Sequence, residues 1–328
     1  MTLSKLRGVK SDHIRHPHPV VKNRHQECYR HIAMLKNGPS NIPKIIESHQ
    51  SGGKWTDTDF NGKNTLYSHF TSDRIKRSYD SKFDDGYWNY YFARLSAKYP
   101  GTGVFGDDRS LYWKEPRQGG AGTCYIISAM SGVGEFPDLI RNAFLTQEQN
   151  SAGIFGIRFF IRGKPWVVTI DDEFLFYNPS YRVPQMVFTK PTNDNPVLWA
   201  SILEKAWAKV KGEYSRANGG FVASGIRSIT GSPVYVFRMS EVAANPDGAN
   251  TYYTINDVYT MLKAANTNNY IMGAGTAGNG NDQEKNRCNI AMSHAYSIVD
   301  AFELVDANRN THKMLMIRNP WGTAYYNG

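Results

Sequence analysis

The stretch Gln118-Gly119-Gly120-Ala121-Gly122-Thr123-Cys124 is a glycine-rich turn that runs directly into the apolar segment YIISAM. This pattern predicts a buried helix that begins at Cys124. The positive end of a helix favours a thiolate over a thiol, which is the form of cysteine that attacks. The turn glycines let a substrate carbonyl approach the backbone closely, and Gln118 adds a side-chain amide to the same region. We therefore predict a nucleophilic cysteine beside an oxyanion-binding turn.

Two polar residues near the end of the chain have the chemistry to serve such a thiol. His294 heads the otherwise apolar strand pattern AYSIV, and Asn319 follows the apolar pattern MLMIR. An imidazole can take the thiol proton, the Asn319 carbonyl can orient the imidazole, and Trp321 can shield that contact from water. A lone cysteine after a turn, or a lone strand histidine, is more often structural. The order cysteine, histidine, asparagine is nevertheless that of papain-type proteases, so we predict that the three residues meet in space.

The sequence resembles the calpain family of intracellular cysteine proteases. The resemblance lies in QGGAGTC at residues 118–124, SHAYS at 293–297 and IRNPWG at 317–322. It extends over about residues 107–328 through the intervening segments AGIF, VTIDD and LEKAWAK. It implies an α+β, papain-like two-lobe protease core, in which a helical lobe carries the cysteine and a sheet lobe carries the histidine and the asparagine.

The same resemblance implies a role for each site residue. Cys124 would be the nucleophile that forms a thioester acyl-enzyme, and His294 would take its proton and later protonate the leaving amine. Asn319 would hold the His294 ring, Trp321 would shield it, and Gln118 would form the oxyanion hole with the backbone N–H of Cys124. The substrates would be exposed, unstructured stretches of intracellular proteins, cut in a limited fashion.

Calcium is implied by the resemblance alone, because the thiol chemistry requires no cofactor. Calpain cores bind calcium in each lobe through carboxylates, and a hard cation needs several oxygen ligands. Two of the expected carboxylate positions hold Val197 and Tyr325. We therefore expect at most a weak calcium site in the first lobe, formed by Glu115 with Asp107 or Asp108.

Two further departures lie beside the thiol and leave other functions open. The residue before the nucleophile is usually acidic in calpains and the one after it is usually Trp, but here they are Thr123 and Tyr125. The alternative function is therefore a catalytically weak or inactive calpain-fold interaction protein. Transglutaminases and papain-like amidases use the same triad, but the calpain motifs disfavour both. A nucleic-acid binder is disfavoured because the sequence has no DNA-specific motif.

The patterns along the chain predict the α+β organisation and three regions. Residues 1–65 read as a basic, His-rich extension, 66–231 as the first lobe, and 232–328 as the second lobe. We expect the second lobe to be incomplete, because a calpain lobe continues for several strands past Asn-Pro-Trp. The predicted helices are 87–98, one from Asn195-Pro196 to Gly212, and 255–265; the predicted strands are 154–161, 166–170, 270–273, 294–302 and 313–318.

Composition and charge limit the class of protein and suggest a partner. Hydrophobic residues make up 41% and charged residues 20% of the 328, which is typical of a globular protein. Three cysteines without CxxC spacing, no secretory signal and no apolar run of ~20 residues favour a cytoplasmic protein without a transmembrane segment. Residues 1–54 carry ten Lys and Arg against three Asp and Glu, most of the net charge of +9. This arm either docks the chain on an acidic, possibly cytoskeletal polymer or larger complex, or is a solvated extension that binds nothing.

Overall fold

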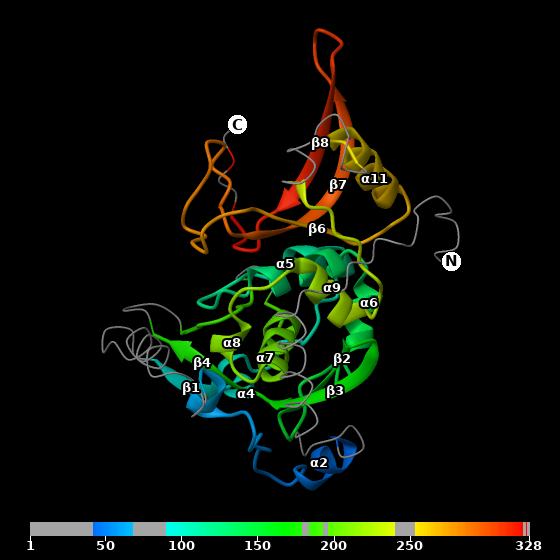
Figure 1. Cartoon of the computed structure of the whole chain (residues 1–328). Helices are drawn as coiled ribbons and strands as arrows, with labels where there is room; N and C mark the ends of the chain where they lie inside the picture. Colours follow the sequence, from blue (N-terminus) through cyan, green and yellow to red (C-terminus); the bar gives the residue numbers. More distant parts are fainter. Residues whose placement is uncertain are drawn as a thin grey trace.

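The computed structural model describes residues 42–67, 90–178, 184–192, 196–239, 253–323 and 326. Figure 1 shows two parts, one containing α5, α7 and strands β1–β5, and above it a three-stranded sheet with α11. This arrangement confirms the predicted α+β architecture with two lobes. Within the described ranges, no helix combines the length and the apolar character needed to cross a membrane.

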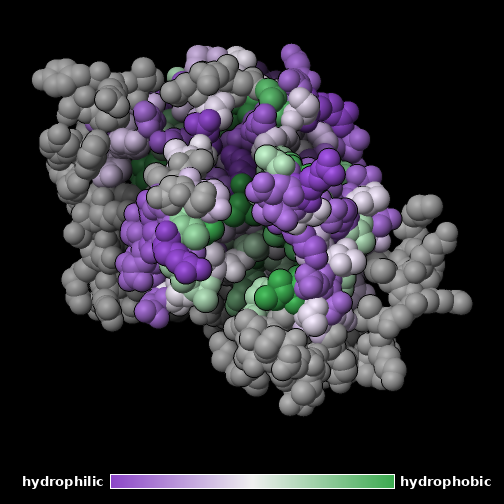
Figure 2. Space-filling view, turned by 90° about the horizontal axis from the view of Figure 1, so that it is seen from above, coloured by the Kyte–Doolittle hydropathy of each residue, from purple (hydrophilic) through white to green (hydrophobic). Residues whose placement is uncertain are grey.

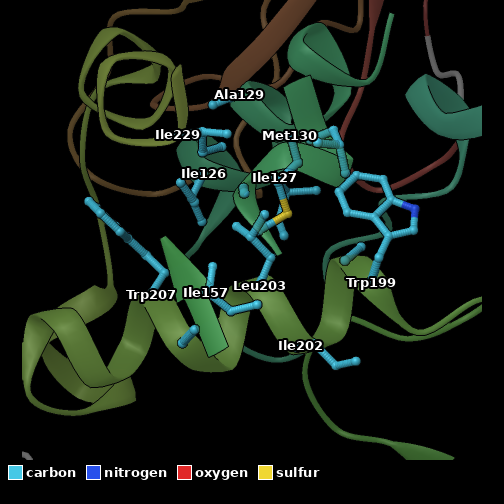
Figure 3. Packing of buried hydrophobic residues seen from close by; sticks show 14 of the residues in the cluster. Ile126, Ile127, Ala129, Met130, Ile157, Trp199, Ile202, Leu203, Trp207 and Ile229 are labelled. Carbon is cyan, nitrogen blue, oxygen red and sulfur yellow. The ribbon is translucent and has the colours of Figure 1, made fainter. Parts of the chain in front are cut away.

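The helix α5 (Cys124–Gly134) lies at the centre of the first lobe, and all of its residues are buried. It packs against α9 (Val222–Thr230) and α7 (Trp199–Lys211), and the apolar side chains of α5 and α7 meet in one cluster (Figure 3). This burial on all sides fixes the position of the first residue of α5. The remaining helical elements are α2 (Ile42–Ser48), η4 (Gly62–Thr65), α4 (Leu95–Lys98), η5 (Arg109–Lys114), α6 (Pro137–Ala143) and α8 (Tyr214–Ala217).

The first lobe also contains two small antiparallel sheets. The strands β1 (Tyr91–Arg94), β4 (Glu173–Tyr177) and β5 (Gln185–Met186) pair in the order β1-β4-β5. The second sheet is a hairpin of β2 (Ile154–Ile161) and β3 (Lys164–Asp171). Its turn places Arg162 and Gly163 at φ values of 52° and 75°, the left-handed conformation that tight hairpins use. The structure therefore confirms the predicted hairpin.

The second lobe is an antiparallel sheet in the order β6-β7-β8, with α11 (Ile255–Thr267) packed on it. Its strands are β6 (Met272–Gly275), β7 (Ala295–Val305) and β8 (Thr311–Arg318). The expected helix and the three expected strands are all present, each within a few residues of its predicted bounds. Seen from above, the face that carries this lobe is mostly hydrophilic (Figure 2).

Two predicted helices differ from the structure. Residues 91–94, expected to be helical, form β1 because their backbone pairs with Glu173–Phe176 of β4. Of the described residues 90–98 in the predicted helix, only Leu95–Lys98 is helical. The helix expected from Asn195-Pro196 begins instead at Trp199, while its predicted end at Gly212 is correct. The backbone N–H groups of Leu198 and Trp199 donate to the carbonyl of Val104, which holds the approach to α7.

The expected N-terminal extension differs from the structure from residue 42 onward; residues 1–41 lie outside the described residues. Ile42 is buried against Ile154 of β2, and Phe60 is buried in a second apolar cluster. Asp57 is fully buried, and its Oδ2 accepts a hydrogen bond of 2.6 Å from Lys209 Nζ of α7. Residues 42–67 therefore pack on the first lobe. The buried residues that make these contacts, Ile42, Asp57 and Phe60, are separated by polar residues in the sequence.

Candidate active site

Cys124 is the first residue of α5, and its side chain lies at the contact between the two lobes. The residue is 9% exposed, and the backbone N–H of Ala295, at the start of β7, hydrogen-bonds to its thiol. Burial raises the pKa of Cys124, and this effect outweighs the opposing effect of that N–H. The position at the helix N-terminus does not by itself offset this burial. The thiol needs a base to remove its proton.

His294 and Asn319 form the hydrogen bond that such a base requires. His294 precedes β7 and Asn319 follows β8, and the pairing of Ser297 with Arg318 brings these two strand ends together. His294 Nε2 lies 3.0 Å from Asn319 Oδ1, which also accepts a bond of 3.0 Å from the Trp321 backbone N–H. A backbone N–H can only donate, so this atom of Asn319 is the oxygen, and Nε2 must carry a hydrogen to bond with it.

The same hydrogen bond sets the proton-accepting nitrogen of His294. With the hydrogen on Nε2, the neutral ring has an unprotonated Nδ1. His294 is 2% exposed, and its Nδ1 has no hydrogen-bond partner among the described residues. Burial lowers the pKa of His294, which keeps the ring neutral, although the hydrogen bond to Asn319 acts in the opposite direction. A neutral imidazole with a free Nδ1 is the state that can accept the thiol proton.

Trp321 packs on the catalytic histidine, and Gln118 is held in the turn before Cys124 by two hydrogen bonds. The ring centroids of Trp321 and His294 are 4.3 Å apart, so the indole lies against the imidazole and its bond to Asn319. Gln118 Nε2 donates one hydrogen bond of 2.8 Å to the Ala121 carbonyl, which leaves its second hydrogen for another acceptor. The Gln118 backbone N–H donates to the Pro320 carbonyl at 2.9 Å, which ties the turn to the second lobe.

Comparison with known proteins agrees with this geometry. The model of the calpain family cysteine proteases matches residues 110–328. The chain belongs to the calpain family. It is 31% identical over 204 residues to the calpain-type cysteine protease DEK1 of Zea mays, an alignment of 62% of this chain and 9% of that protein. It is 30% identical over 221 residues to Calpain-A of Drosophila melanogaster, covering 65% of this chain and 24% of the relative. The chain thus spans less than a third of the length of these calpains.

Arg318 joins the two lobes and was missed by the sequence analysis. Its guanidinium donates to Ser131 Oγ of α5 at 2.8 Å and to the carbonyls of Lys114 and Pro116 at 2.7 and 2.6 Å. Burial lowers its pKa to about 10, so the group stays charged at neutral pH. Its sequence signal was a lone arginine at the end of an apolar strand, next to Asn319. Arg318 therefore holds the strand end that carries Asn319 against the helix that carries the thiol.

The two departures from the calpain pattern beside the thiol have partners in α7. Thr123 Oγ1 donates to Glu204 Oε1, and Glu204 Oε2 accepts a bond of 2.8 Å from the backbone N–H of Thr189. Burial raises the pKa of Glu204. The hydroxyl of Tyr125 accepts a bond of 2.8 Å from the indole N–H of Trp207. Both residues are therefore integrated into the core of this calpain domain.

Two of the residues predicted for a weak calcium site, Glu115 and Asp108, already accept hydrogen bonds from protein donors. Glu115 is buried, its Oε2 accepts from the Trp199 indole, and burial raises its pKa. Asp108 Oδ1 accepts from the backbone and side chain of Ser110, while Asp107 is exposed. In the part of the chain that the structure describes, no three His, Cys, Asp or Glu side chains are grouped to hold a metal ion.

We therefore expect calorimetric titration with calcium to show no binding at the ~10⁻⁷–10⁻⁵ M dissociation constants of sensor sites. The reason is that Glu115 Oε2 and Asp108 Oδ1 already accept hydrogen bonds from protein donors, and that Val197 stands where the family uses a carboxylate. Replacement Glu115→Gln should leave the titration unchanged. Binding in that range by the original chain, lost in the Glu115→Gln variant, would contradict this expectation.

Proposed function

We propose that this chain is a cysteine endopeptidase that cleaves protein substrates through a thioester acyl-enzyme. The observation that carries the proposal is the hydrogen bond between His294 and Asn319, which leaves Nδ1 unprotonated where the second lobe meets the Cys124 thiol. Membership in the calpain family and the protease names of its relatives support the same reaction. An inactive interaction protein is not favoured, because the chain retains Cys124, His294 and Asn319 and because His294 is hydrogen-bonded to Asn319.

The reaction follows from the atoms of the site. As Cys124 Sγ attacks the substrate carbonyl carbon, His294 Nδ1 takes the thiol proton. The resulting oxyanion accepts hydrogen bonds from the free hydrogen of Gln118 Nε2 and from the Cys124 backbone N–H. The imidazolium then protonates the leaving amine as the C–N bond breaks, which leaves the thioester. Water, deprotonated by the same imidazole, attacks the thioester and restores the thiol.

The protonated state of His294 is stabilised mainly by its hydrogen bond to Asn319. The Asn319 oxygen accepts from Nε2 throughout the cycle and keeps the ring from rotating away from the thiol. Trp321 covers this bond, so water does not compete for the amide oxygen. Arg318 maintains the position of the β8 end on which Asn319 lies.

Replacing Gln118 by Ala is expected to lower kcat by about 10²- to 10³-fold, the usual effect of removing one oxyanion donor. KM should change little, because the lost hydrogen bond forms mainly with the developing oxyanion. The matched control is Gln147→Ala, which removes an exposed side chain bonded to Arg141. Steady-state kinetics on a fluorogenic peptide measure both variants. An unchanged kcat in Gln118→Ala would remove this residue from the oxyanion hole.

Cleavage of an unfolded protein substrate tests the proposed activity, with Cys124→Ala as the inactive control. The substrates are proposed to be exposed protein segments, in a cytoplasmic setting.

Docking of residues 1–54 on an acidic, cytoskeletal polymer stays a prediction, because most of this arm lies outside the described residues. Co-sedimentation of the chain with and without the arm, at two salt concentrations, measures it.

A further inference from the structure

A carboxylate that the proposed mechanism does not use lies beside the catalytic pair. Asp282 is part of the segment that joins β6 to β7, and its Oδ2 is 3.8 Å from His294 Nδ1. This nitrogen is the one that accepts the thiol proton. The distance exceeds that of a hydrogen bond, and Asn319 already orients the ring, so Asp282 is not a fourth member of the catalytic set.

The Asp282 carboxylate has room for a further donor. Its Oδ1 accepts a bond of 3.1 Å from the Gln283 side-chain amide, whereas no hydrogen bond from a described residue reaches Oδ2. No Lys or Arg nitrogen among the described residues lies within 4.0 Å of it. The Asp282 side chain is 31% exposed, while that of His294 beside it is fully buried. One oxygen is thus open to a ligand at the edge of the site.

The position of this carboxylate is fixed by the segment that carries it. The backbone N–H of Gly280 donates to Ser293 Oγ at 2.8 Å, and that of Gln283 donates to Asn281 Oδ1 at 3.0 Å. On the far side, the N–H of Met292 donates to the Glu284 carbonyl at 2.8 Å. These bonds connect the segment to the residue that precedes His294, so Asp282 is held near the imidazole before any substrate binds.

The charge of Asp282 acts on both Cys124 and His294. After the larger effect of burial, it contributes to raising the pKa of the Cys124 thiol, and it also acts to raise the pKa of His294. A negative charge here therefore disfavours the thiolate and favours the imidazolium, so its two effects on the proton transfer oppose each other.

We propose that Asp282 is a specificity-determining residue, which selects substrates with a Lys or Arg side chain next to the scissile bond. This inference rests on the proposed protease function. When the carbonyl carbon of the scissile peptide bond meets Cys124 Sγ, the two Cα atoms that flank this bond are only about 3.8 Å apart. The side chains that flank the scissile bond therefore reach a carboxylate that lies beside the imidazole. An ammonium or guanidinium group supplies the donor that Oδ2 lacks, and its charge favours the pairing.

The test compares two peptidyl epoxides that differ only in the side chain next to the reactive group, arginine in one and its neutral isostere citrulline in the other. The rate of Cys124 labelling is followed by mass spectrometry of the intact chain. The arginine probe is expected to label about 10- to 100-fold faster, as one charge-assisted hydrogen bond predicts. Asp282→Asn should abolish this preference. The matched control Glu284→Gln, a neighbouring carboxylate on the same segment, should keep it.

The outcomes separate this inference from the proposed function. Equal labelling of the original chain by both probes would overturn the selection by Asp282 and leave the protease proposal intact. An arginine preference that survives Asp282→Asn would also overturn the inference. The same holds if Asp282→Asn changes the labelling rates of the arginine and citrulline probes by the same factor, because Asp282 would then act on the catalytic pair and not on the substrate side chain. No labelling of Cys124 by either probe would overturn both the proposed function and this inference.

Discussion

Replacing His294 by Ala is expected to lower kcat by roughly 10⁴- to 10⁶-fold, as in other enzymes that lose the base of a nucleophile–base pair. The effect is this large because burial raises the pKa of Cys124, so the thiol does not ionise unaided at neutral pH. Without an imidazole, the leaving amine also has no acid to protonate it. Steady-state kinetics on a peptide substrate provide the measurement, and circular dichroism verifies that the variant folds.

The matched control is another histidine of the second lobe. His312 lies on β8, is exposed and contacts Asp306 at 2.9 Å. His312→Ala should leave kcat within about two-fold, as expected for a surface change far from the reacting atoms. A folded His294→Ala variant that keeps a tenth or more of the activity would exclude His294 as the general base.

Replacing Lys209 by Ala is expected to lower the free energy of unfolding by about 3–5 kcal/mol, since it leaves a buried charge unpaired. Lys209 Nζ donates to Asp57 Oδ2 at 2.6 Å and to the Thr169 carbonyl at 2.8 Å, and both members of the pair are completely buried. Burial lowers the pKa of Lys209 and raises that of Asp57, so each depends on the other for its charge. Urea denaturation measures the loss.

Two further variants test the reason for this loss. Lys211→Ala, in the same helix, removes a cation that lies over the Trp207 ring and should cost no more than about 1 kcal/mol. The double replacement Asp57→Leu with Lys209→Met removes both charges and should be less destabilising than Lys209→Ala alone. If the free energy of unfolding of Lys209→Ala lies within 1 kcal/mol of that of the original chain, the buried pair of Asp57 and Lys209 contributes little to the stability of the first lobe.

The predictions from sequence succeeded where chemistry and structure are both local. A glycine-rich turn before Cys124 specifies a helix start, and polar residues at the ends of apolar strands specify His294 and Asn319. The family motifs also predicted the pairing of His294 with Asn319, which the structure contains as a hydrogen bond of 3.0 Å. The hairpin at 154–171 was equally predictable, because two apolar strands flank a turn with glycine.

The failures concern contacts between residues that are distant in the sequence. Residues 91–94 form a strand because of β4, about 80 residues away, and no local pattern reports that partner. Burial of Asp57 depends on Lys209 of α7, so the polar surroundings of Asp57 suggested an exposed extension instead. The burial that raises the pKa of Cys124 is likewise a property of the packed protein, and no local pattern reports it.

Labelling of the folded chain with a thiol-reactive epoxide, followed by mapping of the adduct, tests the central claim most directly. Cys288 is more exposed than the buried Cys124, so accessibility alone favours labelling at Cys288. We predict that the adduct forms on Cys124 and that His294→Ala abolishes it, because His294 creates the reactive thiolate. Labelling mainly at Cys288 or Cys28, or labelling of Cys124 that is unaffected by His294→Ala, would contradict the account.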